Sequence, residues 1–321
     1  MASLFIRTLQ RVLPQTLWLN LRQRPIIEQH ERVARYWQPL IAKWQEGRLP
    51  HYELTPKKDL PRDQVIWQYW GQGIAEDSLP EVVKLCFASV DRYRGEYQVI
   101  RLSDDTIGEY LDVPEFVWEK LKGNDAFTRT FFSDLLRLML LHTYGGVWLD
   151  ATVLLSGELP REYLEMDFFA FQRDDAERDK ALWRSTYYSY YGWGTGYRVR
   201  LLNSILFAKK GSRIIDAMLD LLLYYWEHEE DILDYFFFQI LFYELVQEGP
   251  LRAENCPIVS DCLPHVVQKK LSSPGYSRYS FSEILTKLHL HKMSYYDQAT
   301  LRHLKDILRK ELPELSPSIL S

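Results

Sequence analysis

The sequence predicts an α/β fold, because short apolar segments typical of strands alternate with longer segments typical of helices. Gln64–Tyr69 is rich in β-branched and aromatic residues, and two glycines close it at positions 71 and 73. Pro80–Tyr93 then places its apolar residues at helical spacing, with proline at the start and a glycine just past the end. A second strand is expected at Tyr97–Leu102. Strands that are joined by helices favour an open sheet with parallel crossovers.

The elements that follow continue this alternation. Two short helices are expected at Asp104–Leu111 and Pro114–Lys122, and a long helix at Asp125–Tyr144 ends at two adjacent glycines. A strand at Val147–Leu155 follows these glycines directly. Further along, the sequence predicts strands at Phe168–Gln172 and Ser204–Ala208, helices at Ser212–His228 and Asp231–Gln247, and a strand end within Lys287–Met293.

The composition excludes several classes of protein. The 321 residues include 39 Lys and Arg against 44 Asp and Glu, a formal net charge of −5. This mild acidity argues against a nucleic-acid partner, because nucleic-acid binders normally carry a strong basic excess. The cysteines Cys86, Cys256 and Cys262 form neither an even disulfide framework nor a zinc motif, which favours a reduced, cytoplasmic environment. No charge-free apolar run reaches the roughly 18 residues that a membrane span needs.

We expect two parts, a basic amphipathic helical extension at residues 1–60 and an α/β domain at residues 61–321. Residues 1–48 hold eight Lys or Arg and three Glu, a net charge of +5 that leaves −10 for the rest of the chain. Such a basic and apolar segment suits a helix on an anionic membrane surface. The alternative is a helix that packs on the body with a solvated basic face. Pro14 and Pro25 are expected to break any single long helix.

The most informative segment is FSDLLRLMLLHTYGGVWLDATVLL, residues 132–155. Asp134 and Arg137 are three residues apart on one helix and therefore share a face. After the two glycines, Asp150 interrupts an apolar strand, where a carboxylate is costly unless it meets a cation, a metal or hydrogen-bond donors. Taken alone, the charged pair suits a surface ion pair, the two glycines suit a helix end, and Asp150 suits a cap of the next element. Together, in this order, they predict a ligand site at the carboxyl end of a strand.

This segment resembles the sugar-binding core of GT-A glycosyltransferases. More narrowly, it resembles bacterial capsular polysaccharide synthesis proteins related to glycosyltransferase family 32, and it is similar to the large clostridial glucosylating toxins. The family pattern is S-D-x-x-R, then G-G-x-[YW]-x-D-x-[DT] after about seven residues. It stands here as Ser133, Asp134, Arg137, Gly145, Gly146, Trp148, Asp150 and Thr152. The resemblance extends from about residue 61 to residue 293, and Ile66–Trp70 is similar to the opening strand of the family.

The resemblance implies an α/β, GT-A-like (Rossmann-like) nucleotide-sugar transferase fold behind the N-terminal helical extension. Ile66 and Trp67 would line the base site, with Gln68 nearby. Asp134 and Arg137 would bind the donor sugar and phosphate, for which the arginine fork is suited because it binds two oxygens. The nucleotide-sugar-binding residues implied are Ile66, Trp67, Gln68, Ser133, Asp134, Arg137, Gly145 and Gly146. The catalytic residues implied are Asp150, Arg137 and Asp134.

The resemblance also implies a divalent metal, Mn²⁺ or Mg²⁺, that neutralises the departing diphosphate. Its expected ligands are Asp150, Thr152 and a late residue, either His291 or Lys292, and His291 is the one predicted. The family motif D-x-D reads D-A-T in this chain, so an uncharged hydroxyl replaces the second acid. This departure puts the dependence on a metal in doubt.

Three residues are candidates for contact with the acceptor: Asp234, Trp193 and Asn203. Asp234 either points at the acceptor or is a favourable acid in the first turn of a helix. Trp193 belongs to an aromatic, glycine-rich stretch at residues 183–197, which reads either as a mobile loop with sugar-stacking rings or as an ordinary packed hairpin. Asn203 opens the strand that follows this stretch.

The sequence therefore predicts a glycosyltransferase that moves a hexose from a nucleotide-sugar to a glycan, with a lipid-linked glycan of capsular or cell-surface polysaccharide as the expected acceptor. The resemblance implies retention of the anomeric configuration. The expected location is cytoplasmic, peripheral at the inner face of the cell membrane through residues 1–48. Two alternatives stay open, a toxin-like enzyme that glycosylates a protein and a non-catalytic glycan-binding protein built on a decayed transferase.

Overall fold

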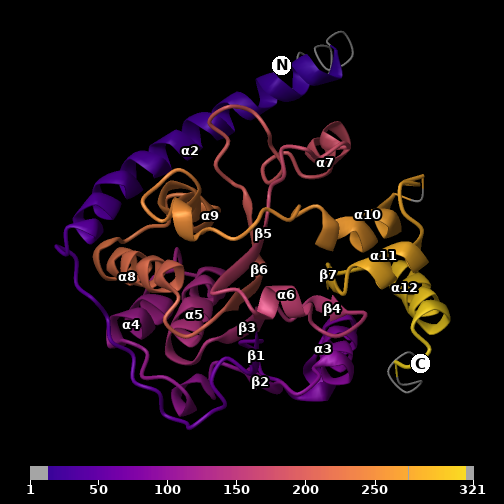
Figure 1. Ribbon diagram of the computed structural model, residues 1–321, viewed down its shortest axis with the longest axis horizontal. Helices are drawn as coiled ribbons and strands as arrows, with labels where there is room; N and C mark the ends of the chain where they lie inside the picture. Colours follow the sequence, from indigo (N-terminus) through magenta and orange to yellow (C-terminus); the bar gives the residue numbers. More distant parts are fainter. Residues whose placement is uncertain (1–13, 274, 316–321) are drawn as a thin grey trace.

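A five-stranded mixed sheet forms the centre of the molecule, with strand order β2-β1-β3-β6-β5 (Figure 1). The computed structural model describes residues 14–273 and 275–315. Strands β2, β1 and β3 are parallel, whereas β6 is antiparallel to β3 and to β5. The strands are β1 Val65–Tyr69, β2 Gln98–Leu102, β3 Gly146–Leu149, β4 Val153–Leu155, β5 Phe168–Gln172, β6 Leu201–Ala208 and β7 Leu290–Lys292. The predicted α/β class and its parallel crossovers are confirmed.

Helices surround this sheet and join its strands. The α-helices are α2 Gln15–Gln45, α3 Glu81–Tyr93, α4 Glu115–Gly123, α5 Arg129–Tyr144, α6 Arg161–Leu164, α7 Lys180–Thr186, α8 Arg213–His228, α9 Phe237–Phe242, α10 Val266–Ser272, α11 Phe281–Lys287 and α12 Gln298–Glu311. Helix α5 packs on β1, β3 and α8, and its apolar faces are buried. Its carboxyl half leads through the two glycines directly into β3, as the sequence predicts.

The prediction of one continuous strand at Val147–Leu155 is wrong, because the chain leaves the central sheet at Asp150. Strand β3 pairs with β1 and β6, whereas β4 pairs with β7 in a separate two-stranded sheet. The turn between them is closed by a hydrogen bond from the Val153 N–H to the Asp150 carbonyl, at 2.8 Å. Asp150 therefore stands at the edge of the central sheet rather than inside a strand.

Within the described part of the N-terminal segment, residues 15–45 form one continuous helix, α2, so the prediction that Pro25 breaks the helix is wrong. Pro14 immediately precedes the helix, and α2 continues for 31 residues with Pro25 and Pro39 inside it. A proline inside a helix costs about 3 kcal/mol, so other contacts must offset that cost. The buried face of α2 does so by packing on α8 and α9, with Trp37 fully buried (Figure 1).

These contacts bear on the membrane expectation for residues 1–48. From Gln23 onward α2 packs on the body, as in the second of the two alternatives. Membrane contact stays a prediction, and residues 1–13 of that segment lie outside the described residues. No helix in the described ranges combines the length and apolar character that crossing a bilayer requires.

Two of the predicted helices differ from the observed ones. The segment 104–111 forms only a single 3₁₀ turn, Ile107–Glu109. The helix expected at 231–247 begins later, at Phe237, and ends as a π-helical turn, Tyr243–Gln247. Asp234 accepts a hydrogen bond from the Phe236 N–H at 2.8 Å, and this turn competes with helix before Phe237.

Gly146 allows β3 to approach β1 closely, and we predict that alanine there destabilises the fold. Its φ is +102°, and a Cβ would lie 2.2 Å from the Val65 carbonyl oxygen. Gly146→Ala is expected to lower the free energy of unfolding by about 2–3 kcal/mol, measured by urea denaturation. At Gly211, where φ is +93° with open space around it, alanine is expected to cost about 1–2 kcal/mol. Equal effects would contradict the close-approach explanation.

Candidate functional site

A cavity of about 660 Å³ opens at the carboxyl ends of β1 and β3. One face of α5 and the turn after β3 line its base. Aromatic residues between α7 and β6, the residues just before α9, and the C-terminal segment around β7 form the other walls. Ligands of open α/β sheets bind at this edge, because the carboxyl ends of parallel strands meet there. The cavity is within the size range of small-molecule and cofactor sites.

Asp134 and Arg137 form a buried ion pair in this cavity, as the helical spacing predicts. The Arg137 Nη1 atom lies 3.0 Å from the Asp134 Oδ1 atom. Arg137 also donates to the Ser133 hydroxyl at 2.9 Å and to the Asn203 carbonyl at 2.7 Å. The amide of Asn203 donates in turn to Asp134 at 2.8 Å. Strand β6 thus holds the charged pair of α5 in one orientation.

Burial changes the acidity of Asp134. It raises the pKa of this carboxyl group to about 6, and the nearby Asp150 carboxylate adds to the rise, although the Arg137 guanidinium opposes it. Burial thus favours the neutral carboxyl group, whereas the Arg137 guanidinium favours the carboxylate. A charged group this deeply buried is stable only because it is paired and hydrogen-bonded.

Asp150 is more open to the cavity than the other two charged residues. Its side chain is 25% exposed, and the Arg137 Nη2 atom lies 3.5 Å from its Oδ1 atom. The Trp148 indole N–H donates to the same oxygen at 2.8 Å. The second oxygen, Oδ2, lies 3.9 Å from the ammonium nitrogen of Lys292. Asp150 is therefore held between two cations and presents a carboxylate edge to a ligand.

An aromatic wall faces these charges. Trp183, Tyr187, Tyr190 and Tyr191 line the cavity from the segment around and after α7. Tyr187 is exposed, whereas the other three are almost fully buried. The predicted aromatic stretch is thus a set of packed turns in which rings border the cavity.

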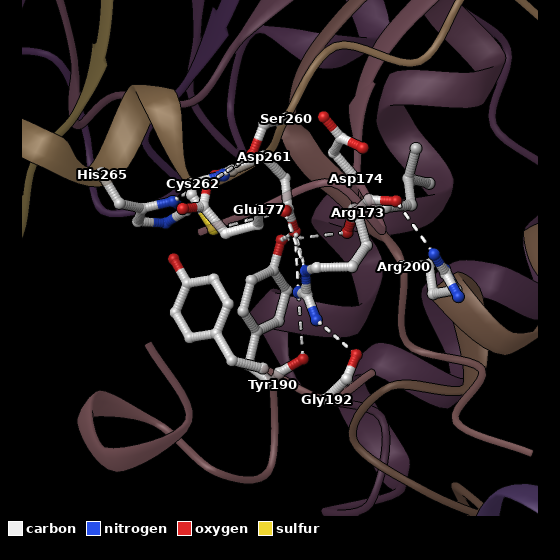
Figure 2. Close-up of polar contacts among 12 residues, drawn as sticks. Arg173, Asp174, Glu177, Tyr190, Gly192, Arg200, Ser260, Asp261, Cys262 and His265 are labelled. Atoms are coloured by element: carbon white, nitrogen blue, oxygen red, sulfur yellow. Dashed lines mark hydrogen bonds and ion pairs between the residues drawn. The ribbon is translucent and has the colours of Figure 1, made fainter. Parts of the chain in front are cut away.

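A buried ion pair holds this wall in place (Figure 2). The Arg173 guanidinium donates to the Asp261 carboxylate at 2.8 and 2.7 Å, and both side chains are fully buried. Arg173 also donates to the carbonyls of Tyr190 and Gly192, and the Tyr190 hydroxyl donates to Asp261 at 2.9 Å. Burial alone would lower the pKa of Arg173, but the Asp261 carboxylate outweighs it, so the pKa is raised.

Five of the residues predicted for the site line the cavity: Ser133, Asp134, Arg137, Asp150 and Asn203. Lys292, the alternative to His291, lines it as well. The base-site prediction for Ile66, Trp67 and Gln68 needs correction, because all three are fully buried inside β1 and do not line the cavity. The Trp67 indole N–H instead donates to the Gly145 carbonyl. The cavity begins at the next residues of the chain, residues 69–72, where β1 emerges from the sheet.

Gly145 and Gly146 also lie away from the cavity and are corrected to structural residues. Strand β3 is four residues long, so these glycines and Asp150 are at its opposite ends. A Cβ on Gly145 would lie 1.9 Å from the Asp63 carboxylate, and Gly146 contacts the backbone of β1. Both have positive φ, which allows α5 to end and β3 to begin within one tight turn.

The expected metal ligands Asp150, Thr152 and His291 are not brought together. His291 is fully buried, its Nε2 atom lies 2.9 Å from the Ser156 hydroxyl, and burial lowers its pKa to about 3. Thr152 accepts a hydrogen bond from Lys292. Among the described residues, no three His, Cys, Asp or Glu side chains gather closely enough to hold a metal ion. The described residues here therefore form no complete protein cage for a divalent cation, and Mn²⁺ or Mg²⁺ shared between Asp150 and a diphosphate stays a prediction.

Two of the acceptor candidates lie outside the cavity lining. The Trp193 indole N–H donates to the Asp174 carbonyl at 2.8 Å, and its ring stacks on Tyr191. Asp234 forms the turn before α9, whereas its neighbours Tyr235 and Phe236 line the cavity. Because the helix starts three residues later, Asp234 is not an acid in its first turn, and its contact with the acceptor stays a prediction.

Several cavity residues were missed from the sequence, and Gln239 and His265 are the most informative. The Gln239 side chain is buried, and its Oε1 atom has no hydrogen-bond partner among the described residues. The His265 Nδ1–H donates to the Asp261 carbonyl at 2.8 Å, and burial lowers the pKa of this imidazole to about 4. Gln239 lies within an apolar run and His265 within an irregular segment, so neither carries a local motif.

Comparisons with known proteins identify one family for this chain. A family model described as capsular polysaccharide synthesis protein matches residues 18–311. No curated protein matches the chain significantly. A solved structure titled PaToxG Glycosyltransferase is similar, with 15% identity, 92% of each chain covered and a TM-score of 0.32. Because the family model matches nearly the whole described chain, this protein belongs to the capsular polysaccharide synthesis protein family.

Proposed function

We propose that this protein is a glycosyltransferase of GT-A-like fold that transfers a hexose from a nucleotide-sugar to a glycan acceptor during capsular polysaccharide synthesis. The observation that carries this proposal is the buried group of Asp134, Arg137 and Asp150 at the carboxyl ends of parallel strands, in a cavity of about 660 Å³. Membership of the capsular polysaccharide synthesis family supports the proposal that the glycan product is capsular polysaccharide.

Each wall of the cavity has a role in this proposal. The nucleotide base lies against residues 69–72, where β1 ends. Arg137, whose N–H groups hold Asp134, Ser133 and Asn203, supplies positive charge beside the diphosphate. Asp134 accepts hydrogen bonds from hydroxyl groups of the donor sugar, and the unpartnered Gln239 carbonyl is available for another.

The acceptor occupies the side of the cavity that the aromatic wall borders. Tyr187 and Tyr235 are both exposed at its rim, and flat rings stack well on sugar rings. We propose a lipid-linked glycan as acceptor and retention of the anomeric configuration. An α-linked product from an α-linked donor, identified by NMR, supports retention, and a β-linked product contradicts it.

The first test is the thermal stability of the protein with a panel of nucleotide-sugars. A ligand at 100 times its Kd is expected to raise the stability by about 2.7 kcal/mol. The panel contains UDP-glucose, UDP-galactose, UDP-N-acetylglucosamine and GDP-mannose, each with and without Mn²⁺. One donor is expected to raise the Tm of the wild type and to lose this effect in Asp150→Ala.

Asp167→Asn is the matched control, because Asp167 is exposed and does not line the cavity. It is expected to keep the donor-induced shift. The donor that binds is then incubated with glycan and protein acceptors, and release of the nucleotide is measured. Transfer to protein would favour the toxin-like alternative, binding without turnover would favour a non-catalytic protein, and absence of any shift would contradict the proposed function.

A further inference from the structure

Lys292 places a fixed positive charge where the family motif leads one to expect a metal. Its Nζ atom donates to the Thr152 hydroxyl at 2.5 Å and to the Met293 carbonyl at 3.3 Å, and it lies 3.9 Å from Asp150 Oδ2. The side chain is 21% exposed and lines the cavity. The ammonium group therefore lies near both residues that stand at the two acid positions of the D-x-D motif.

The strand pairing explains why Lys292 rather than His291 reaches this position. Strand β7 runs antiparallel to β4, with Lys292 opposite Val153 and His291 opposite Leu154. Successive side chains of a strand point to opposite faces. Lys292 consequently extends toward the turn that carries Asp150 and Thr152, and His291 points into the core beside Ser156.

This arrangement disfavours a divalent cation between Asp150 and Thr152. The Thr152 oxygen already accepts a hydrogen bond from the ammonium group, and a second positive charge within a few ångströms would be repelled. An uncharged threonine would bind a metal weakly, yet it is well suited to orient a lysine. The threonine of the D-A-T sequence and the position of Lys292 thus both favour an ammonium group over a metal ion at this place.

We infer that Lys292 and Arg137 together supply the positive charge that stabilises the leaving diphosphate, so that sugar transfer needs no divalent cation. This inference rests on the proposed function. In the transfer, the bond from the sugar C1 atom to the diphosphate oxygen breaks, and its electron pair stays on the diphosphate. A bond forms from C1 to the acceptor hydroxyl oxygen, whose proton passes to an oxygen of the departing diphosphate. Lys292 remains protonated, and Thr152 is a positioning residue for it.

The experiment measures nucleotide binding by isothermal titration calorimetry. UDP, GDP, CDP and ADP, and the corresponding monophosphates, are titrated into the full chain, once with EDTA and once with Mn²⁺ or Mg²⁺. The diphosphate that binds is expected to have the same Kd in all buffers. Lys292→Met is expected to weaken diphosphate binding by about 10- to 100-fold, the usual effect of losing one hydrogen bond to a charged group.

The comparison of diphosphate with monophosphate separates a charge effect from a structural one. Lys292→Met should weaken monophosphate binding much less, whereas a damaged fold would weaken both equally. Lys209→Met is the control, because Lys209 is an exposed lysine that does not line the cavity. Lys292→Glu is expected to make diphosphate binding dependent on Mn²⁺, since it places a carboxylate beside Asp150 and Thr152.

The possible results are distinct. Binding of a diphosphate in EDTA that Lys292→Met weakens supports the inference. Binding by the wild type that requires Mn²⁺ or Mg²⁺ overturns the inference and leaves the proposed function intact, as does unchanged binding by Lys292→Met. If no nucleotide binds to the wild type in any buffer, the proposed function itself is contradicted.

Discussion

Replacing Arg137 with lysine is expected to reduce sugar transfer by about 100-fold or more while the protein stays folded. The change keeps the positive charge and removes the planar fork. Arg137 uses that fork to hold Asp134, the Ser133 hydroxyl and the Asn203 carbonyl at once. A lysine ammonium is a point charge with three donors and cannot make all of these contacts at once.

The measurement is kcat/KM for release of the nucleotide from the donor that the thermal-shift panel identifies. Arg198→Lys is the matched control. Arg198 is also a mostly buried arginine, paired with Glu31 and Glu244, but it does not line the cavity. We expect Arg198→Lys to lower the Tm with kcat/KM unchanged. Equal losses of activity in the two variants would contradict the special role of Arg137.

Replacing Asp261 with asparagine is expected to lower the free energy of unfolding by about 3–5 kcal/mol, the usual cost of breaking a buried ion pair on one side. The Arg173 guanidinium would then be a buried charge without its counter-ion. The Tyr190 hydroxyl, which donates to Asp261, would lose a charged acceptor. Urea denaturation of the variant and the wild type gives this difference.

The same variant is expected to disturb the cavity, because Arg173 holds the aromatic wall through the Tyr190 and Gly192 carbonyls (Figure 2). A rise in KM for the acceptor, larger than the change in donor affinity, is the expected result. Should Asp261→Asn fail to fold, the double variant Arg173→Met with Asp261→Leu tests the same idea, since an apolar pair removes the unpaired charge. Its stability is expected to exceed that of Asp261→Asn.

The control for stability is the exposed ion pair of Arg161, the first residue of α6, with Glu165, the residue just after this helix. Glu165→Gln is expected to change the free energy of unfolding by less than about 1 kcal/mol, because water screens exposed charges. A loss in Asp261→Asn as small as that in Glu165→Gln would contradict a structural role for the buried pair.

Local patterns were sufficient to predict much of the fold and the centre of the site. The spacing of three residues places Asp134 and Arg137 on one face of α5, and the ion pair between them follows from helix geometry alone. Strands β1, β2 and β5 lie within one residue of their predicted bounds. These features depend on residues that are neighbours in the chain.

Errors arose where a local pattern competed with a distant contact. Packing of Trp37 and its neighbours on the body carries α2 through Pro25, which the proline rule alone does not allow. The apolar run around Asp150 is divided between two sheets, because β3 finds its partners in β1 and β6 and β4 finds its partner in β7. The base site was placed on side chains that the sheet buries, one to three residues before the cavity lining begins.

The sequence by itself determined the α/β class, the family, the charged pair of α5 and the carboxylate just after β3, because these depend on short-range periodicity and on a compact motif. Only the tertiary structure decided which distant residues complete the site. Lys292 reaches Thr152 across 140 positions, and Arg173 reaches Asp261 across 88. Such contacts depend on how strands pair and which face of each strand is turned inward, and a one-residue shift in β7 would exchange Lys292 for His291.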